Sequence, residues 1–318
     1  MRVAITGAGG FIGSRLVEAL AGHCHQVRAL STGATSGCAA GVEQRRVHVS
    51  EAAIQWGDAI RGMEAVIHLA GRAHVMAEAS ADPLEEFRRV NVRATLQLAH
   101  QAIEEGVRRF IFVSSIGVNG SSTSGCAFTE AATPAPTEPY AVSKWEAEQG
   151  LRELEQRSKL ELTIVRLPLV YGPRAKGNFA RLLRLVRSGI PLPLASVRNL
   201  RSYAGLDNVC DFLELCLQHP SAAGQLFLLA DGKDVSTPDL ISAMAISMDR
   251  PSHLFSCPPS LLRAVAGLAG RRAEVDRLTG SLQVDATRAR SKLNWTPPVS
   301  FDSGIAAMTQ WYLEQGSR

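Results

Sequence analysis

Residues 1–13 read MRVAITGAGGFIG, and this stretch decides the fold. Val3–Ile5 is a short apolar run that predicts a buried strand. Glycines spaced three residues apart follow it: Gly7, Gly10 and Gly13. Phe11–Ala21 then carries apolar residues at helical spacing, so the whole stretch is expected to form a strand, a tight turn and a helix.

A turn of this kind suits a bound phosphate. The first glycine permits the sharp reversal, the second lets the backbone approach a pyrophosphate, and the third lets the helix pack closely on the strand. The first turn of the helix adds N–H donors and the positive end of its dipole. We therefore predict a dinucleotide site, with contacts from the loop and the start of the helix: Gly7, Gly10, Phe11, Ile12 and Gly13.

The following residues alternate between apolar runs and helix-like stretches. Further strands are expected at Gln26–Leu30, Val47–Val49, Ala65–Leu69, Phe110–Ser114 and Leu162–Leu167, and long helices at Glu85–Glu105 and Pro139–Gln156. Strands that are apolar on both faces and separated by helices indicate a parallel sheet covered on both sides. The predicted fold class is α/β, a doubly wound parallel Rossmann sheet.

The pattern changes near residue 170, where prolines become denser and the expected helices shorter. We predict a dinucleotide-binding domain over residues 1–170 and a smaller, mostly helical substrate domain over residues 171–318. A length of 318 residues suits two domains, at roughly 150 residues each. Gln225–Leu229 reads as a strand, and its return to the first sheet is one interpretation.

The composition is that of an ordinary globular protein. Hydrophobic residues make up 46% and charged residues 20%, which excludes global disorder. The net charge of +4 comes from dispersed arginines, so no nucleic-acid partner is expected. No apolar stretch approaches the ~18 residues of a membrane span, and the first apolar run is too short for a secretory signal, so we expect a cytoplasmic protein. The six cysteines lack zinc-ligand spacing, so we predict no metal.

The second expected strand ends in Leu30-Ser31-Thr32-Gly33, near the predicted adenosine ribose. Sites for NAD usually place an acid there to bond the ribose 2′-hydroxyl. A carboxylate would repel a 2′-phosphate, and none is present, so NADP(H) is favoured over NAD(H). Arg28 and Arg45 are candidate partners for that phosphate.

Tyr140 and Lys144 stand four residues apart on one face of an expected helix. A free phenol has a pKa of about 10, and a nearby ammonium is expected to lower it. Ser114 and Ser115 end the fifth expected strand, at the edge where open α/β sheets hold their ligands. A hydroxyl there would position a reacting carbonyl or alcohol.

The order of glycine loop, strand-end serine and Tyr-x3-Lys resembles the extended short-chain dehydrogenase/reductase family, over nearly the whole chain. Further matching segments are Val66–Ala70, Asn91-Val92, Arg166–Pro173 and Arg201–Tyr203. The resemblance implies that Ser115 is the catalytic hydroxyl and Tyr140 the acid/base. It implies that Lys144 tunes Tyr140 and holds the nicotinamide ribose, as Tyr140 and Lys144 also contact the cofactor. It implies further cofactor contacts from Ser31, Ala70, Gly71, Asn91 and Pro168.

Two positions depart from the family pattern. Many members carry an Asp that bonds the adenine amine where this chain has Val49-Ser50. Many read Val-Tyr-Gly after the catalytic strand, where this chain has Val118-Asn119-Gly120. The second departure weakens any sugar contact that the resemblance would give to that tyrosine.

The second half is similar to that of nucleotide-diphospho-sugar enzymes. The resemblance implies that Asn178 and Arg201 bind the diphosphate of a UDP-sugar, alongside Ser115 at the sugar. A guanidinium fork suits a diphosphate. The resemblance also implies a homodimer through the two long helices, Glu85–Glu105 and Pro139–Gln156.

Three reactions share this apparatus. A 4,6-dehydratase needs acids beside the catalytic hydroxyl, and Ile116-Gly117 stands there instead. Three segments closely resemble bacterial 4-ketoreductases that make UDP-linked 6-deoxy-N-acetylhexosamines for O-antigen: Ile67–Met76, Ser143–Gln149 and Gly280–Asp285. We expect NAD(P)H-dependent reduction of a UDP-4-keto-6-deoxy-N-acetylhexosamine. The alternative is a UDP-hexose or UDP-N-acetylhexosamine 4-epimerase with tightly bound NAD. A non-catalytic NAD(P)-binding sensor is disfavoured, because Tyr140 and Lys144 are both present.

Overall fold

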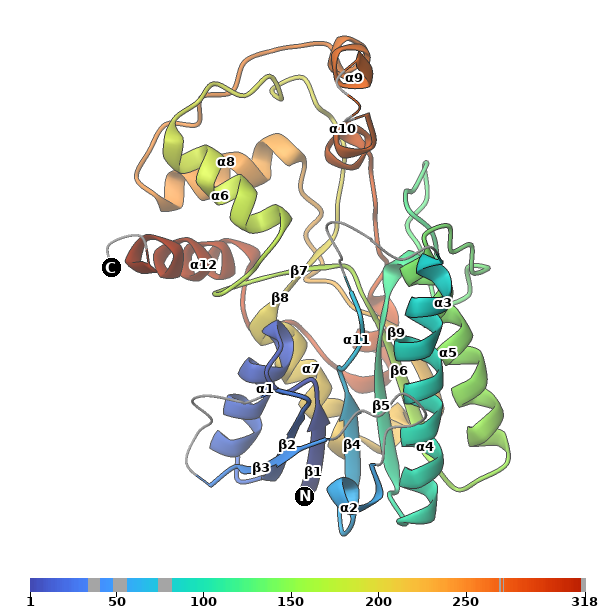
Figure 1. The fold of residues 1–318 in the computed structure, drawn as a ribbon. Helices are drawn as coiled ribbons and strands as arrows, with labels where there is room; N and C mark the ends of the chain where they lie inside the picture. The colour runs from blue at the N-terminus through green and yellow to red at the C-terminus, as the bar shows by residue number, and fades with distance from the viewer. Residues whose placement is uncertain (34–40, 48–55, 74–81, 269, 271, 316–318) are drawn as a thin grey trace.

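The computed structural model describes residues 1–33, 41–47, 56–73, 82–268, 270 and 272–315. Its centre is a seven-stranded sheet in the order β3-β2-β1-β4-β5-β6-β9, with every neighbouring pair parallel. The strands are β1 (Arg2–Thr6), β2 (Gln26–Ser31), β3 (Glu43–Arg46), β4 (Ala65–His68), β5 (Arg109–Ser115), β6 (Glu161–Leu167) and β9 (Gln225–Leu228). The predicted doubly wound Rossmann sheet is confirmed (Figure 1).

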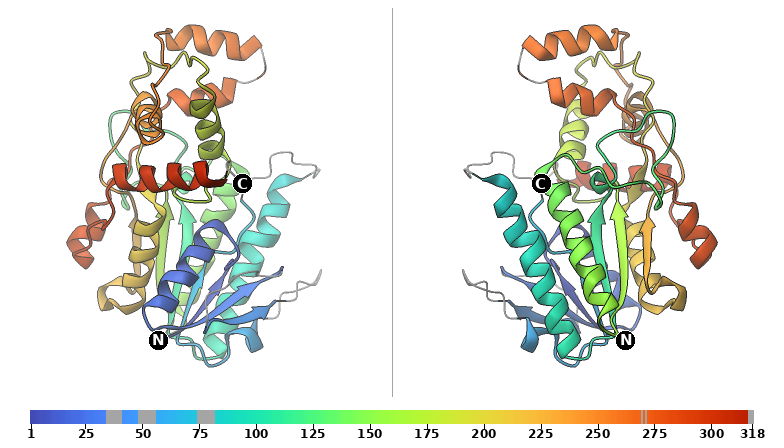
Figure 2. Two further views of the ribbon diagram at one scale, coloured as in Figure 1. Left: turned by 90° about the vertical axis from the view of Figure 1, so that its left-hand side faces the viewer. Right: turned by 90° about the vertical axis from the view of Figure 1, so that its right-hand side faces the viewer.

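Helices cover both faces of this sheet, because successive residues of each buried strand point to opposite sides. Val3 and Ile5 pack into one core with α1 (Phe11–Gly22), α7 (Leu206–Gln218) and α11 (Thr287–Leu293). Ala4 packs into the other core, with α2 (Gly57–Ile60), α4 (Ala94–Glu104) and α5 (Pro139–Gln156). Strands that are apolar on both faces therefore lie between two layers of helices (Figure 2).

The second half builds a third core above the carboxyl ends of the strands. It contains a two-stranded sheet of β7 (Leu169–Tyr171) and β8 (Tyr203–Gly205), with α6 (Asn178–Ser188), α8 (Thr237–Ser247) and α12 (Phe301–Gln315). Helices α9 (Pro259–Leu268) and α10 (Arg272–Thr279) form the far tip (Figure 2). Among the residues that the structure describes, no helix is both long and apolar enough to cross a membrane.

Strand β9 belongs to the first sheet although it lies late in the sequence. It pairs in parallel with β6, with Ile164 opposite Leu226. The chain therefore leaves the sheet after β6, builds part of the second half and returns. The 3-10 turn η3 (Pro220–Ala222) stands just before β9. The division at residue 170 stays a prediction.

Two expected elements differ from the structure. The stretch Glu85–Glu105, expected as one helix, consists of α3 (Pro83–Phe87), a π-helical segment η1 (Arg88–Arg93) and α4. The third strand, expected at Val47–Val49, is Glu43–Arg46, and residues 48–49 lie outside the described residues. This strand is at the edge of the sheet and fully exposed, so it carries charged residues instead of the apolar pattern of a buried strand.

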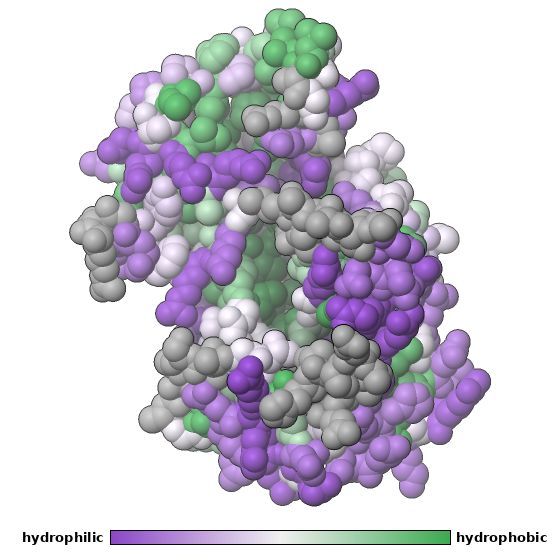
Figure 3. All heavy atoms as spheres, viewed as in Figure 1, coloured by the Kyte–Doolittle hydropathy of each residue, from purple (hydrophilic) through white to green (hydrophobic). Residues whose placement is uncertain are grey.

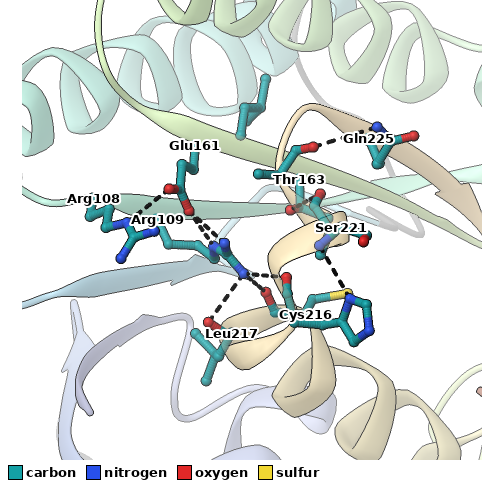
Figure 4. Close-up of polar contacts among 12 residues, drawn as sticks. Arg108, Arg109, Glu161, Thr163, Cys216, Leu217, Ser221 and Gln225 are labelled. Carbon is teal, nitrogen blue, oxygen red and sulfur yellow. Dashed lines mark hydrogen bonds and ion pairs between the residues drawn. The ribbon is translucent and has the colours of Figure 1, made fainter. Parts of the chain in front are cut away.

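At the amino end of the sheet, Arg109 fastens α7 to β5 (Figure 4). Its Nη1 donates to the carbonyl oxygens of Cys216 at 2.7 Å, Leu217 at 3.2 Å and His219 at 2.9 Å. The same guanidinium pairs with Glu161, the first residue of β6. A cation at a helix C-terminus satisfies the last carbonyls and the negative end of the dipole. Arg109 therefore joins two strands and a helix.

Candidate active site

The glycine loop brings the chain into close contact with itself after β1. Gly7 has a φ of 68°, and a Cβ there would lie 2.8 Å from the backbone nitrogen of Ala70. A Cβ on Gly13 would lie 2.1 Å from the carbonyl oxygen of Gly7, so only glycine fits where α1 crosses the loop. At Gly10, the N-cap of α1, a Cβ would lie 3.0 Å from that same oxygen.

The start of α1 suits an anion. Gly10 caps the helix without a side-chain hydrogen bond, and the first turn, which begins with Phe11 and Ile12, holds no acidic residue. Backbone N–H donors and the helix dipole at such a terminus favour a phosphate. The predicted loop residues therefore lie together and fit the pyrophosphate of a dinucleotide.

His68 links the glycine loop to the neighbouring strand β4. Its Nδ1 lies 2.6 Å from the Thr6 hydroxyl and its Nε2 lies 2.8 Å from the Thr95 hydroxyl. The Thr6 hydroxyl also accepts from the Ala70 N–H at 3.1 Å. Burial, with the nearby Lys144 charge, lowers the pKa of His68 to about 3, so this imidazole is neutral. The sequence gives no sign of this role, since a histidine inside an apolar strand reads as core.

Lys144 is buried at the carboxyl edge of the sheet. Its ammonium donates to the carbonyl oxygen of Val113 at 3.0 Å and lies 4.6 Å from the centre of the Phe112 ring. A Cβ on Gly71 would lie 3.4 Å from the Lys144 Nζ, so the loop after β4 passes directly over the ammonium. Burial lowers the pKa of Lys144 to about 8, and the Glu148 carboxylate acts in the opposite direction.

Ser115 ends β5 and lies close to Gly117, which is next to the first turn of α5. Its hydroxyl oxygen accepts from the Gly117 N–H at 3.1 Å. A Cβ on Gly117 would lie 3.3 Å from that hydroxyl and 3.2 Å from the Ala141 Cβ, next to Tyr140 in the chain. The end of β5 and the start of α5 are thus in contact, as the two motifs require.

Tyr140 is half-buried, and its ring meets the Phe87 ring edge-on with centroids 6.1 Å apart. Burial raises the pKa of Tyr140 to about 12. In this arrangement the Lys144 ammonium is directed to the Val113 carbonyl oxygen, and its predicted effect on the pKa of Tyr140 stays a prediction. The phenol is therefore protonated at neutral pH.

Asn91 joins the loop after β4 to α5. Its Oδ1 accepts from the Arg72 N–H at 2.7 Å, and its Nδ2 donates to the Arg72 carbonyl oxygen and to the Ser143 hydroxyl, both at 3.0 Å. Ser143 in turn donates to the Tyr140 carbonyl oxygen at 2.8 Å. Asn91 lies in the π-helical segment η1, a geometry frequent at functional sites. Ser143, which stands between Tyr140 and Lys144, was not predicted from the sequence.

The cofactor residues expected at the adenosine end lie farther along the same edge. Ser31 ends β2, and its hydroxyl donates to the Gly33 carbonyl oxygen at 2.6 Å. Pro168 is buried between β6 and β7. The adenine position, Val49-Ser50, falls outside the described residues, as do residues 74–76 of the segment that resembles ketoreductases.

The arginines predicted to bind a 2′-phosphate need correction. Arg28 bonds Glu43 at 2.7 Å and two carbonyl oxygens, so its guanidinium is already engaged away from the end of β2. Arg45 also bonds Glu43. Arg46 instead stands opposite Ser31 in the sheet register, and its Nε donates to the Thr32 carbonyl oxygen at 3.3 Å. Arg46 was not predicted because its strand, β3, is polar and exposed and so lacks the apolar pattern of a buried strand.

The two predicted diphosphate residues occupy different surroundings. Asn178 is exposed and begins α6. Arg201 is half-buried where two chain segments cross, and its Nη1 donates to the carbonyl oxygens of Arg277 at 2.9 Å and Gly280 at 3.0 Å. Leu282 forms a bridge with Arg201, so part of the C-terminal motif contacts this position.

The surface is hollowed between the two halves, and apolar side chains line the hollow (Figure 3). The carboxyl ends of β1, β4 and β5 face it, below the second half (Figure 1). Among the described residues, no group of three or more His, Cys, Asp or Glu side chains could hold a metal ion.

Sequence comparisons identify the family of this chain. Residues 3–230 match the NAD dependent epimerase/dehydratase family. A UDP-glucose 4-epimerase of Vibrio cholerae is 43% identical over 261 residues, covering 81% of this chain and 80% of that protein. An N-acetyl-α-D-glucosaminyl-diphospho-ditrans,octacis-undecaprenol 4-epimerase of Escherichia coli O157:H7 is 24% identical, covering 97% of this chain and 94% of that protein.

Solved structures share the whole fold. MoeE5 in complex with UDP-glucuronic acid and NAD superimposes with a TM-score of 0.79 at 25% identity, over 99% of this chain and 100% of that one. DesIV, a dTDP-glucose 4,6-dehydratase from Streptomyces venezuelae with NAD bound, has a TM-score of 0.79 at 23% identity, over 100% of this chain and 98% of that one. The chain belongs to the NAD dependent epimerase/dehydratase family, in agreement with the resemblance of its motifs to the extended short-chain dehydrogenases/reductases.

Proposed function

We propose that this enzyme reduces the C4 keto group of a UDP-4-keto-6-deoxy-N-acetylhexosamine with NAD(P)H, for surface polysaccharide synthesis. The observation that carries the proposal is the meeting of three motifs at one edge of the sheet. The Lys144 ammonium lies against Gly71, and Gly117, two residues after Ser115, lies close to Ala141 at the start of α5. The glycine loop, which suits a pyrophosphate, opens at the same edge.

The cofactor supplies the hydride, and the chain supplies position and charge. Tyr140 is protonated at neutral pH, so its hydroxyl donates a proton to the C4 oxygen as the carbonyl is reduced. Ser115 holds that oxygen by a hydrogen bond. The Lys144 ammonium stabilises the tyrosinate that remains. Because Lys144 is buried, its positive charge acts on the tyrosinate more strongly than it would in water.

Arg46 supports the preference for NADP(H). It ends β3 opposite Ser31, where a dinucleotide on the glycine loop places its adenosine ribose. Ser31, Thr32 and Gly33, at the end of β2 and just after it, include no acid that would repel a 2′-phosphate. We infer that the Arg46 guanidinium binds this phosphate, in place of Arg28 and Arg45.

Arg201, Asn178 and the segment Gly280–Asp285 are proposed to hold the UDP-sugar. This segment bridges Arg201 through Leu282, and it bridges Phe128 in the loop after β5 through Val284. It therefore links a proposed diphosphate residue to the chain that follows Ser115. Because it is one of the segments that resemble ketoreductases, its position supports a role in substrate choice.

A 4-epimerase is the second candidate function. It is favoured by the Vibrio cholerae relative, a UDP-glucose 4-epimerase that is 43% identical to this chain over 261 residues. Epimerisation uses the same groups twice, with Tyr140 first accepting and then returning the proton. An epimerase retains its NAD and needs no added reductant, whereas a reductase consumes one cofactor for each turnover.

The test supplies purified enzyme with NADPH and either a UDP-4-keto-6-deoxy-N-acetylhexosamine or UDP-N-acetylglucosamine. The proposal expects stoichiometric NADPH oxidation with the keto sugar only. Interconversion of the unmodified UDP-sugars without net oxidation would establish the epimerase instead. We also propose a homodimer through α4 and α5, which light scattering of the eluted protein would measure as twice the chain mass of 34.1 kDa.

A further inference from the structure

A buried polar network lies beside the proposed site, where β5, β6 and α5 pack together. Its four side chains are Ser114, Asn119, Glu148 and Arg166, and we call them the Glu148 network. None of the four residues is more than 4% exposed. The proposed mechanism uses none of their side chains.

The Glu148 carboxylate is fully bonded. Ser114 donates from its hydroxyl to Oε1 at 2.5 Å. Arg166 donates from Nε and Nη2 to the two carboxylate oxygens, with a shortest distance of 2.6 Å. The Arg166 Nη1 donates to the Asn119 Oδ1 at 2.8 Å. A bidentate arginine and a hydroxyl together fix both the place and the orientation of this carboxylate.

Stability alone is a weak explanation for this arrangement. Removing two charges from water costs several kcal/mol per ion, and apolar residues of similar volume often serve the fold equally well. The Arg166–Glu148 pair is 2% exposed on both sides and therefore carries that cost. A charged pair kept in such a position suggests that the orientation or the electric field of the Glu148 carboxylate has a function.

The network touches every element that holds a proposed catalytic residue. Ser114 directly precedes Ser115 on β5. Glu148 follows Lys144 by four residues on α5, so the two side chains share a helix face. Asn119 follows the short 3-10 turn η2 (Ile116–Val118), which Ser115 caps. Moving the carboxylate would therefore move the strand end relative to the helix.

The charged and titratable groups around Lys144 show which of them affects its protonation. His68 on β4 interacts electrostatically with the ammonium and is neutral. Tyr140 on the same helix is neutral at pH 7. Arg72, in the loop after β4, is paired with Glu86. The Glu148 carboxylate is the group that favours the charged form of Lys144 against the effect of burial.

Without Glu148, the Lys144 ammonium would lose the carboxylate that favours its charged form, and the buried Arg166 guanidinium would lose its ion-pair partner. Like charges in a poorly solvated place disfavour each other. The lysine is the one that would lose its proton, because a guanidinium stays charged in proteins.

We propose that Glu148 is a positioning residue that also acts through its charge. Bonded by Ser114 and Arg166, it fixes the end of β5 against α5 and keeps a carboxylate one helical turn from Lys144. This inference rests on the proposed function in one respect, that Lys144 acts in turnover as a cation. The network itself is independent of the sugar that is reduced.

The first experiment compares pH–rate profiles of kcat for the wild type and Glu148→Gln. Glutamine keeps the shape and removes the charge. The alkaline limb, where Lys144 loses its proton, is expected to move down by about one pH unit. Glu153→Gln is the matched control, because Glu153 is exposed on the same helix, and its limb should not move.

A second readout does not depend on turnover. The free energy of unfolding should rise with pH above the folded-state pKa of Lys144, because the unfolded chain then binds more protons. This rise should begin near pH 8 in the wild type and at lower pH in Glu148→Gln. Lys144→Met should remove it in both backgrounds. If the rise shifts but no turnover is found on any sugar, the proposed function fails and the inference stands.

A third variant separates position from charge. Ser114→Ala removes one hydrogen bond but leaves the carboxylate charged, so kcat should fall several-fold at every pH with the alkaline limb unmoved. If Glu148→Gln fails to fold, Glu148→Gln with Arg166→Met removes both charges and should fold with the lowered limb. A uniform loss of activity in Glu148→Gln, with limb and stability profile unshifted, would overturn the proposal.

Discussion

The Lys144 ammonium is bonded to the carbonyl oxygen of Val113, 3.0 Å away, at a position where the lysine is only 4% exposed. One carbonyl and the face of the Phe112 ring replace the water that a free ammonium would bind. Burying a cation away from water destabilises the fold. This cost fits the proposed use of the Lys144 charge in turnover.

Replacing Lys144 with Met should make the protein more stable while abolishing turnover. The pKa of Lys144 is about 8 in the fold against an ordinary 10.5, which corresponds to a cost on the order of 3 kcal/mol at neutral pH. Since the folded-state pKa is lowered, the cost is present below pH 8 and disappears as pH rises towards 10.5. Denaturant unfolding at pH 7 and pH 10 measures the difference.

The control for this prediction is Lys159→Met, at an exposed lysine, which should change stability little at either pH. A Lys144→Met protein that is less stable than the wild type at pH 7 would contradict the account of the buried charge.

Replacing Tyr140 with Phe should lower turnover by at least about 100-fold, because the proton donor is lost. Its ring packing against Phe87 would remain, since phenylalanine keeps the aromatic face. Cofactor affinity, measured by fluorescence titration of NADPH, should change by less than about threefold. Turnover at the wild-type rate would show that another group supplies the proton.

Replacing Arg46 with Ala should weaken the use of NADPH and leave the use of NADH nearly unchanged. A charge-assisted hydrogen bond to phosphate contributes about 1.5–3 kcal/mol, so kcat/KM for NADPH should fall by about 10- to 100-fold. Arg45→Ala is the neighbouring control, because that guanidinium bonds Glu43. Equal losses with both cofactors would mean that Arg46 does not read the 2′-phosphate.

Replacing Arg109 with Met should destabilise the fold by about 3 kcal/mol, because three carbonyl oxygens at the end of α7 lose their donor. Arg108→Met is a close control, since Arg108 bonds the same Glu161 but its side chain is 76% exposed. Such a surface pair is worth less than about 1 kcal/mol. Similar midpoints of urea unfolding for the two variants would contradict the role assigned to Arg109.

Much of the fold follows from local patterns. The buried strands β1, β4, β5 and β6 were predicted because continuous apolar runs have few other interpretations. The edge strand β3 was misplaced because exposure removes that pattern. The π-helical segment around Asn91 was not predicted, because its reason is tertiary: the side chain reaches Arg72 and Ser143 from outside the helix.

The parts of the candidate site that belong to sequence motifs could be predicted. The parts that depend on contacts between residues distant in the sequence could not. Tyr140, Lys144 and the glycine loop have fixed spacings in the sequence. Arg166 is fully buried inside β6, so its place in the strand gives no sign that it bonds Glu148. Asn119 stood out only as a departure from the family pattern, and its bond to Arg166 becomes visible once β6 and η2 are placed side by side.

Net hydride transfer to C4 of the sugar distinguishes a reductase from an epimerase. The direct measurement is a reaction of the keto sugar with NADPH that carries deuterium on the transferable position of the nicotinamide, followed by mass and NMR analysis of the product. A 4-ketoreductase should place one deuterium at C4 of every product molecule. Product formed without deuterium, or interconversion of unmodified UDP-sugars by enzyme that retains its own NAD, would contradict it.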